Sequence, residues 1–171
     1  MRRRLLLNIK GSSDRMQELV SDLLDLARMR SDRFELRLGT VDLAVLAAGA
    51  LALMQPMTDA KRQRTALRVG TPAPVVRGDP DRLERVLLNL LGNASAFAPE
   101  EAGIGVAVET IGDEARIAVS DTGPGIPPEA MPRLFEQFYT ARTSSTRHGG
   151  GAGLGLPIAQ GIVTAHGGRI W

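Results

Sequence analysis

The sequence predicts an α+β fold: a two-layer sandwich in which helices cover one face of a mixed sheet, with one long helix before it. Three observations support this prediction. Apolar residues recur at helical spacing in the first 30 residues and again in later segments. Short stretches between these segments alternate apolar and polar residues, as half-buried strands do. Near the C-terminal end, a glycine-rich run leads directly into a helical pattern.

Composition narrows the possible classes of protein. The chain has 171 residues, 43% of them hydrophobic, which suffices for one core and an appended element. Its formal net charge of +2 is too small to favour a nucleic-acid partner. The absence of cysteine excludes disulfides and thiolate metal sites. The longest apolar run, at 41–54, is short of a membrane span, so we expect a soluble cytoplasmic domain, whether or not its parent protein spans a membrane.

Residues 5–30 predict one long helix. Ile9, Met16 and Leu23 repeat every seven residues, and a second apolar series interleaves with them. This spacing is typical of a coiled-coil seam. We expect the helix to pair with a second copy of the chain in a homodimer, or with a segment outside it. The alternative is a helix that folds back on its own domain.

The rest of the chain alternates strands and helices. Period-two patterns predict strands at 31–39, 65–69, 75–78, 104–110 and 115–121, and the start of another at 169–171. Helical patterns predict helices at 42–58, from about 79, at 127–135 and at 154–165, with a loop at 136–151. Asp42 occupies the N-cap position of the first of these helices.

The glycine-rich run HGGGAGLGLPI, at 148–158, is the first candidate for a ligand site. Glycine lets the backbone approach a ligand closely and adopt positive φ. The N-terminus of the helix that follows offers free N–H groups and the positive end of a dipole, which suit phosphate. Alone, the run could equally be a flexible surface loop. NLLGNA at 89–94 and DTGPGI at 121–126 precede it, and the three motifs together favour a nucleotide site.

The two earlier motifs carry polar side chains suited to a nucleotide. Asn89 and Asn93 lie four residues apart, on one face of a predicted helix, and an amide oxygen is a hard, neutral ligand for Mg²⁺. Asp121 ends a strand, where its carboxylate can accept from the exocyclic amine of adenine in a hydrogen bond worth roughly 1.5–3 kcal/mol. The alternatives are buried helix amides and an ordinary aspartate in a Gly-Pro turn.

In this order, the motifs resemble those of the ATP-binding domain of sensor histidine kinases, within the fold shared with type II topoisomerases, MutL proteins and a major ATP-dependent chaperone. DRLERVLLNLLGNASAFAP resembles the asparagine box, and DTGPGI the first glycine box. LFEQFY resembles the phenylalanine box, and GGAGLGLPIA the second glycine box. The resemblance implies two domains: residues 1–33 as part of the dimerisation domain, and 34–171 as the catalytic domain with its last strand cut short.

The resemblance also implies the site and its chemistry. The expected cofactors are ATP and Mg²⁺, with Asn93 as the metal ligand and Asn89 positioning water or phosphate, and these two as the catalytic residues. The expected ATP-binding residues are Asn93, Asp121, Gly123, Gly125, Ile126, Arg142, Gly151, Gly153, Leu154 and Gly155. The γ-phosphate would pass to a histidine on a dimerisation helix that this chain lacks, and then to a response regulator.

The chain departs from the family pattern in three ways. Ala96 stands where a basic residue is usual after the asparagine box, and Thr140 where many members carry an arginine. The phosphoacceptor helix is absent, and neither His148 nor His166 lies in a matching context; His166 is better explained as part of a helix stop. Two alternatives follow: a nucleotide-binding or dimerisation module without turnover, and an anti-sigma-type serine kinase, which the heptad helix disfavours.

Overall fold

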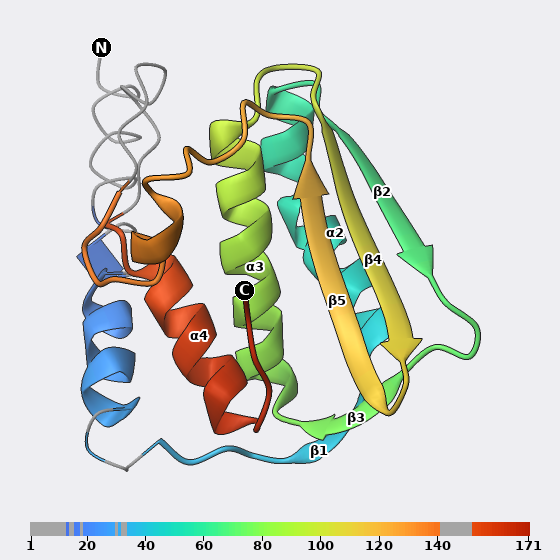
Figure 1. Cartoon of the computed structure of the whole chain (residues 1–171), viewed down its shortest axis with the longest axis vertical. Coiled ribbons are helices and arrows are strands. Elements are labelled where there is room, and N and C mark those ends of the chain that lie inside the picture. The colour runs from blue at the N-terminus through green and yellow to red at the C-terminus, as the bar shows by residue number, and fades with distance from the viewer. Residues whose placement is uncertain (1–12, 14–15, 18, 30, 32–33, 141–151) are drawn as a thin grey trace. The chain divides into compact units, whose positions relative to one another are not determined.

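The computed structural model describes residues 13, 16–17, 19–29, 31, 34–140 and 152–171 (Figure 1). The chain divides into two compact units, the second of which covers Leu36–Trp171. In the first unit, residues 19–29 are helical, which confirms the helix predicted there. The rest of the predicted helix lies largely outside the described residues. Several of its apolar side chains are exposed, including Val20, Leu23 and Leu24.

The second unit contains two sheets and three α-helices within its described residues. Its elements are β1 (Gly39–Asp42), α2 (Leu43–Ala60), β2 (Arg64–Val69), β3 (Val75–Gly78), α3 (Pro80–Phe97), β4 (Gly103–Ile111), β5 (Glu114–Asp121), the 3-10 turn η1 (Met131–Arg133) and α4 (Gly155–Ala165). The predicted helices at 42–58, from 79 and at 154–165 are confirmed. The strands predicted at 65–69, 75–78, 104–110 and 115–121 are confirmed as β2, β3, β4 and β5.

The larger sheet has the strand order β2-β4-β5 and is mixed. β2 runs parallel to β4, with Leu67 opposite Val106, and β5 runs antiparallel to β4, with Val119 opposite Val106. A parallel pair needs a crossover connection, which β3 and α3 supply. β1 and β3 form a separate antiparallel pair. Helices α2 and α3 lie against one face of the larger sheet, and α4 packs on α3 (Figure 1).

The core fills the space between this sheet and α2 and α3. Ile104, Val106 and Val108, at alternating positions of β4, are each at most 2% exposed. They pack with apolar residues of both helices: Leu43, Ala47, Ala50, Met54, Leu87, Leu91 and Ala94. Every second side chain of β4 is therefore buried, on the face that contacts the helices, as the alternating sequence predicted.

Helix α2 is longer than the apolar run suggested. It continues through Pro56 to Ala60, and its length and composition alone would suffice to cross a membrane. Ala47 and Ala50, however, have no exposed surface and belong to the same core as β4. These contacts make α2 the core helix of the second unit.

Two predicted strands are wrong. Residues 34–38 are not in a strand: β1 begins only at Gly39, because its partner strand β3 ends at Gly78, opposite that residue. Residues 169–171 are not in a strand either. Their contact with β5 includes a side-chain ion pair, in which Arg169 lies 2.8 Å from Glu114.

The short helix predicted at 127–135 is also wrong in extent. Only Met131–Arg133 form a helical turn, of the 3-10 type. Pro132 lacks the backbone N–H that the sixth residue of such a helix would donate to the preceding turn. The segment therefore consists mostly of turns.

The N-terminus of α3 depends on a buried carboxylate. Asp79 is 5% exposed, and its Oδ1 accepts from the N–H of Arg82 at 3.2 Å while its Oδ2 accepts from the N–H of Arg37 at 2.8 Å. Burial by itself raises the pKa of Asp79, but the two amide hydrogen bonds outweigh it and hold that pKa below its ordinary value. The positive charge of Arg82 acts in the same direction.

We expect Asp79→Asn to lower the free energy of unfolding at neutral pH by roughly 1–2 kcal/mol, because asparagine offers one acceptor oxygen where two are used. A lowered folded-state pKa means that the carboxylate's contribution is complete above its unfolded pKa of about 4, and is lost as the pH falls through the folded value. The difference between wild type and variant in urea denaturation should therefore shrink below about pH 4.

Asp42→Asn is the matched control at the N-cap of α2. The single Oδ1 of Asp42 accepts from the N–H groups of both Ala44 and Val45, at 2.8 and 3.1 Å, and asparagine retains that oxygen. This variant should lose less than about 0.5 kcal/mol. Equal losses from the two variants, or an Asp79→Asn difference that persists at low pH, would contradict this account.

Candidate functional site

Helix α3 carries the two asparagines that the sequence singled out. The Nδ2 of Asn89 donates to the carbonyl of Gly155, the first residue of α4, at 3.0 Å. Because a carbonyl can only accept, the amide is oriented with Oδ1 as its remaining acceptor. Asn93 lies one turn further along α3, half-buried, and has no hydrogen-bond partner among the described residues. The structure thus brings the asparagine face of α3 against the start of α4.

The second glycine box packs against the end of the phenylalanine box. The carbonyl of Gly153 accepts from the N–H of Phe138 at 2.9 Å. Gly153 has φ +71°, and a Cβ there would lie 2.7 Å from backbone atoms of Phe138 and Tyr139. Leu154 is buried directly after it, and a Cβ on Gly155 would lie 3.3 Å from Oδ1 of Asn89. Glycine is therefore required at 153, where the two boxes meet.

The first glycine box lies against the other end of α3. The exposed carboxylate of Asp121, at the end of β5, accepts from the N–H of Gly123 through Oδ1 at 2.7 Å. A Cβ on Gly123 would lie 3.2 Å from the Cα of Ala98, the C-cap of α3. Gly125 has φ +75° with open space around it, and Ile126 is 51% exposed. This loop leaves glycine backbone and one carboxylate oxygen accessible.

The two glycine boxes meet the same helix at separated points. The second contacts α3 at Asn89 and the first at Ala98, nine residues further along. At 1.5 Å per residue the two points are about 13 Å apart along the axis. Asn93 lies between them. The arrangement places amide, carboxylate and glycine groups along one helix, as an elongated polar ligand would need.

A buried polar cluster behind this surface was not foreseen. Gln63 is 6% exposed, and its amide donates to the carbonyls of Ser95, Ala98 and Pro99 at 3.1–3.2 Å. Ser95, with no exposed surface, donates its hydroxyl back to Gln63 at 2.7 Å. These bonds satisfy the carbonyl of Ser95, in the last turn of α3, and two carbonyls just after the helix, next to the first glycine box. One signal was available: Ser95 follows Leu87 and Leu91 at helical spacing, so a hydroxyl occupies a core position.

His166 ends α4 as predicted and has both ring nitrogens engaged. The helix stops at Ala165, and Gly167 follows with φ +75°. Nε2 of His166 accepts from the N–H of Asp79 at 2.9 Å, and Nδ1 lies 2.8 Å from the carbonyl of Ile162. Neither nitrogen is free to accept a phosphoryl group in this conformation. The expected contacts from Arg142 and Gly151 lie outside the described residues, as does His148.

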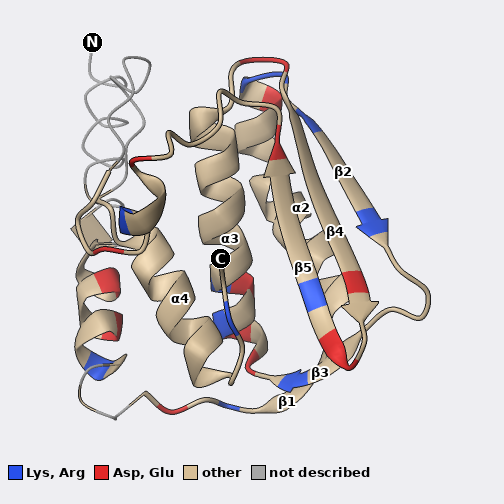
Figure 2. Cartoon of the chain, in the orientation of Figure 1, with Lys and Arg blue, Asp and Glu red and all other residues tan. Residues whose placement is uncertain are grey.

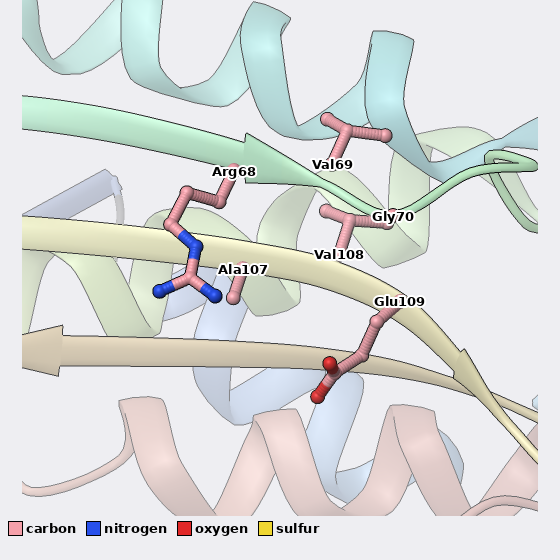
Figure 3. Close-up of a pocket in the computed structure, with 6 residues that line it drawn as sticks. All are labelled: Arg68, Val69, Gly70, Ala107, Val108 and Glu109. Atoms are coloured by element: carbon pink, nitrogen blue, oxygen red, sulfur yellow. The ribbon is translucent and has the colours of Figure 1, made fainter.

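A separate depression lies on the sheet, away from these motifs (Figure 3). Its lining consists of Arg68, Val69, Gly70, Ala107, Val108 and Glu109. Arg68 and Glu109 extend from the neighbouring strands β2 and β4 on the side of Ala107, and the valines point the other way. None of the predicted site residues takes part. Among the residues that the structure describes, no three His, Asp or Glu side chains lie close enough together to hold a metal ion.

Comparison with known proteins gives matches over most of the chain. The sequence model of the family described as "Histidine kinase-, DNA gyrase B-, and HSP90-like ATPase" matches residues 78–171. The circadian input-output histidine kinase CikA of Synechococcus elongatus is 35% identical over 164 residues, 95% of this chain and 22% of that protein. The alginate biosynthesis sensor protein KinB of Pseudomonas aeruginosa is 35% identical over 166 residues, 97% of this chain and 27% of that protein. The chain thus spans about a quarter of the length of these relatives.

Solved structures of similar fold agree with these matches. Full-length ShkA in complex with AMPPNP has a TM-score of 0.83 at 35% identity, over 96% of this chain and 34% of that one. The catalytic domain of the histidine kinase ThkA has a TM-score of 0.69 at 27% identity, over 79% of this chain and 86% of that one. The first similarity extends over both units of this chain.

We expect Gly153→Ala to destabilise the second unit more than Gly125→Ala. Both substitutions place an alanine at left-handed φ, at a cost of roughly 1–2 kcal/mol. Only at 153 does the new Cβ also meet backbone, at 2.7 Å, whereas the position at Gly125 is open. The further loss at 153 should be at least about 1 kcal/mol, measured by urea denaturation. Equal losses would mean that the two boxes do not pack as described.

Proposed function

Because this chain belongs to the family of histidine kinase-, DNA gyrase B- and HSP90-like ATPases, as a sensor histidine kinase, we propose that its second unit binds Mg-ATP and presents the γ-phosphate to a histidine. The observation that carries this proposal is the hydrogen bond from Asn89 to the Gly155 carbonyl. It joins the amide-bearing face of α3 to the N-terminus of α4, where a phosphate-binding turn is expected.

The triphosphate would lie at the end of this site formed by α4. The first N–H groups of α4 lack a side-chain cap and carry the positive end of the helix dipole. Gly153 and Gly155 keep the approach to these groups clear of side chains. Asn93 would supply an amide oxygen to Mg²⁺, which takes few protein ligands and completes its shell with phosphate and water. This donor set fits the absence of a grouped acidic site among the described residues.

The adenine would lie at the other end, beside Asp121. Only Oδ1 of this carboxylate has a partner among the described residues, so Oδ2 can accept from the exocyclic amine of adenine. Guanine presents a carbonyl at the corresponding position, which would face the carboxylate. Gly125 and the exposed Ile126 would border the base. The site would therefore select adenine over guanine.

Catalysis in such a site rests on positioning and charge neutralisation. A lone pair of the imidazole attacks the γ-phosphorus, and the bond to the bridging oxygen of ADP breaks. Asn89 is an amide and cannot act as a strong general base. It would instead orient groups around the phosphate, because its Nδ2 is held by Gly155 and its Oδ1 remains an acceptor. An imidazole nucleophile needs no stronger base, since it attacks through a nitrogen that carries no proton.

The larger protein supplies the remaining parts of the reaction. We assign residues 1–33 to the second helix of a dimerisation domain and 34–171 to the catalytic domain. The exposed Leu23 and Leu24, and the heptad spacing, support a homodimer formed through that helix. The histidine lies on a helix outside this chain, and an aspartate of a response regulator would take the phosphate next. We place the catalytic unit in the cytoplasm, where ATP is available.

A second candidate is a nucleotide-binding or dimerisation module without turnover. Ala96 and Thr140 favour it, because each replaces a residue that would contact phosphate in the family pattern. The retained Asn93, Asp121 and second glycine box oppose it. The two candidates agree on nucleotide binding and differ on phosphoryl transfer. An anti-sigma-type serine kinase is disfavoured by the heptad helix.

Calorimetric titration with a nonhydrolysable ATP analogue tests the binding proposal. Wild type should bind the ATP analogue and not its GTP counterpart, and binding should weaken without Mg²⁺. Asp121→Asn should weaken binding by roughly 10- to 100-fold, because the amide replaces a charge-assisted hydrogen bond. Asp113→Asn, at the exposed β4–β5 turn, is the matched control and should bind as wild type does. No saturable binding by folded wild type would refute the proposed function.

Labelling with radioactive ATP separates the kinase from the module. Alone, the chain should not label itself, because neither of its histidines lies in a phosphoacceptor context. Addition of a separate dimerisation domain carrying the phosphoacceptor helix should give acid-labile label on that domain, and Asn93→Ala should abolish it. Label on His148 or His166 would contradict the assignment, and an unlabelled acceptor with bound ATP would favour the module.

A further inference from the structure

Helices α3 and α4 are joined by hydrogen bonds at two separate points. Asn89 donates to the carbonyl of Gly155, and the N–H of Asp79 donates to Nε2 of His166. The points are ten residues apart along α3 and eleven along the α4 segment, or about 15 and 16 Å at 1.5 Å per residue. The matching spans, in reversed order, mean that the helices run antiparallel and are held at both ends (Figure 1).

The α4 side of the surface between the two points is apolar. Helix α4 contains no charged residue (Figure 2), and its Ile158 and Ile162 have no exposed surface. Apolar contact is non-directional, so it specifies the axial position of one helix against the other less sharply than a hydrogen bond does. The two hydrogen bonds are directional and can fix that position. One of them uses Gly155, which belongs to the phosphate-binding turn of the proposed site.

The His166 end has a defined chemical form. The backbone N–H of Asp79 can only donate, so Nε2 must be an unprotonated acceptor. Nδ1 then carries the proton and donates to the carbonyl of Ile162 at 2.8 Å. A Cβ on Gly78 would lie 3.3 Å from Cδ2 and 3.4 Å from Nε2 of His166, so the imidazole edge lies directly against the backbone of Gly78. The hydrogen bond from Asp79 to His166 is therefore a specific contact between the end of α4 and the start of α3.

We propose that His166 is a positioning residue: through Nε2 it fixes the axial position of α4 against α3, and thereby the position of the second glycine box relative to Asn89 and Asn93. The effect of this position on ATP binding rests on the proposed function. Asp79 also accepts from the N–H of Arg37, so the same residue ties the start of the second unit to both helices. His166 thus acts on the nucleotide from the far end of α4.

Three variants test the role of the acceptor nitrogen. His166→Leu removes the acceptor at similar volume, and His166→Gln restores an acceptor near the place of Nε2. Gln160→Ala, on the exposed face of α4, is the matched control. The leucine variant should bind the ATP analogue about 3- to 10-fold more weakly, the range expected for one net hydrogen bond, and the glutamine variant should recover most of the loss. The control should bind as wild type does.

Nuclear magnetic resonance without nucleotide gives an independent readout. In wild type, the ¹⁵N resonances of His166 should report a proton on Nδ1 and none on Nε2, with the second histidine identified by His148→Gln. The side-chain amide resonances of Asn89 should shift in the leucine variant and return in the glutamine variant. A purely local role of His166 would leave Asn89 unchanged, at the other end of α4.

The outcomes separate this inference from the proposed function. Wild type that binds no ATP refutes the proposed function, and the Asn89 and imidazole resonances then decide the inference by themselves. Wild-type His166 with its proton on Nε2 overturns the inference, even where the leucine variant does not fold. A folded His166→Leu variant with unchanged Asn89 resonances and unchanged affinity overturns it as well.

Discussion

The structure depends on how both ends of α3 are satisfied. This helix buries Leu87 and Leu91 in the core and presents two asparagines to the proposed site. The N–H groups at its start and the carbonyls at its end have no partner within the helix, so they need hydrogen bonds from elsewhere. The carboxylate of Asp79 accepts from the N–H of Arg82 in the first turn of α3, and the side-chain amide of Gln63 donates to the carbonyl of Ser95 in its last turn. Both groups are nearly buried, and the loss of either partner would leave a polar group unpaired.

The same two ends organise the motifs around α3. At the N-terminal end, Asp79 connects to Arg37, where the second unit begins, and to His166, where α4 ends. At the C-terminal end, Ala98 packs against the backbone of Gly123 in the first glycine box. Motifs that are distant in sequence are thus arranged by contact with one helix. The order of the two glycine boxes along it, the second at Asn89 and the first at Ala98, follows from these contacts.

The sequence predicts those elements whose signals lie within their own segment of the chain. The helices that begin at Leu43, Pro80 and Gly155, and the β4–β5 hairpin, are predictable because caps, periodicity and turn glycines lie within each segment. The strands predicted at 31–39 and 169–171 are wrong over 34–38 and 169–171, because alternation carries no information about a pairing partner. The bonds of Gln63 and of His166 join residues 32 and 87 positions apart, and no local pattern contains such information.

The end of α3 also explains how the chain tolerates Ala96. In the family pattern a basic side chain near this position would lie at the negative end of the helix dipole, where cations are favourable. Here Lys61, from the turn after α2, donates to the carbonyls of Ser95 and Ala96. Together with Gln63 it provides both the charge and the hydrogen bonds that this end needs. The helix is therefore complete without a basic residue at 96, and any cost of Ala96 falls on contact with phosphate.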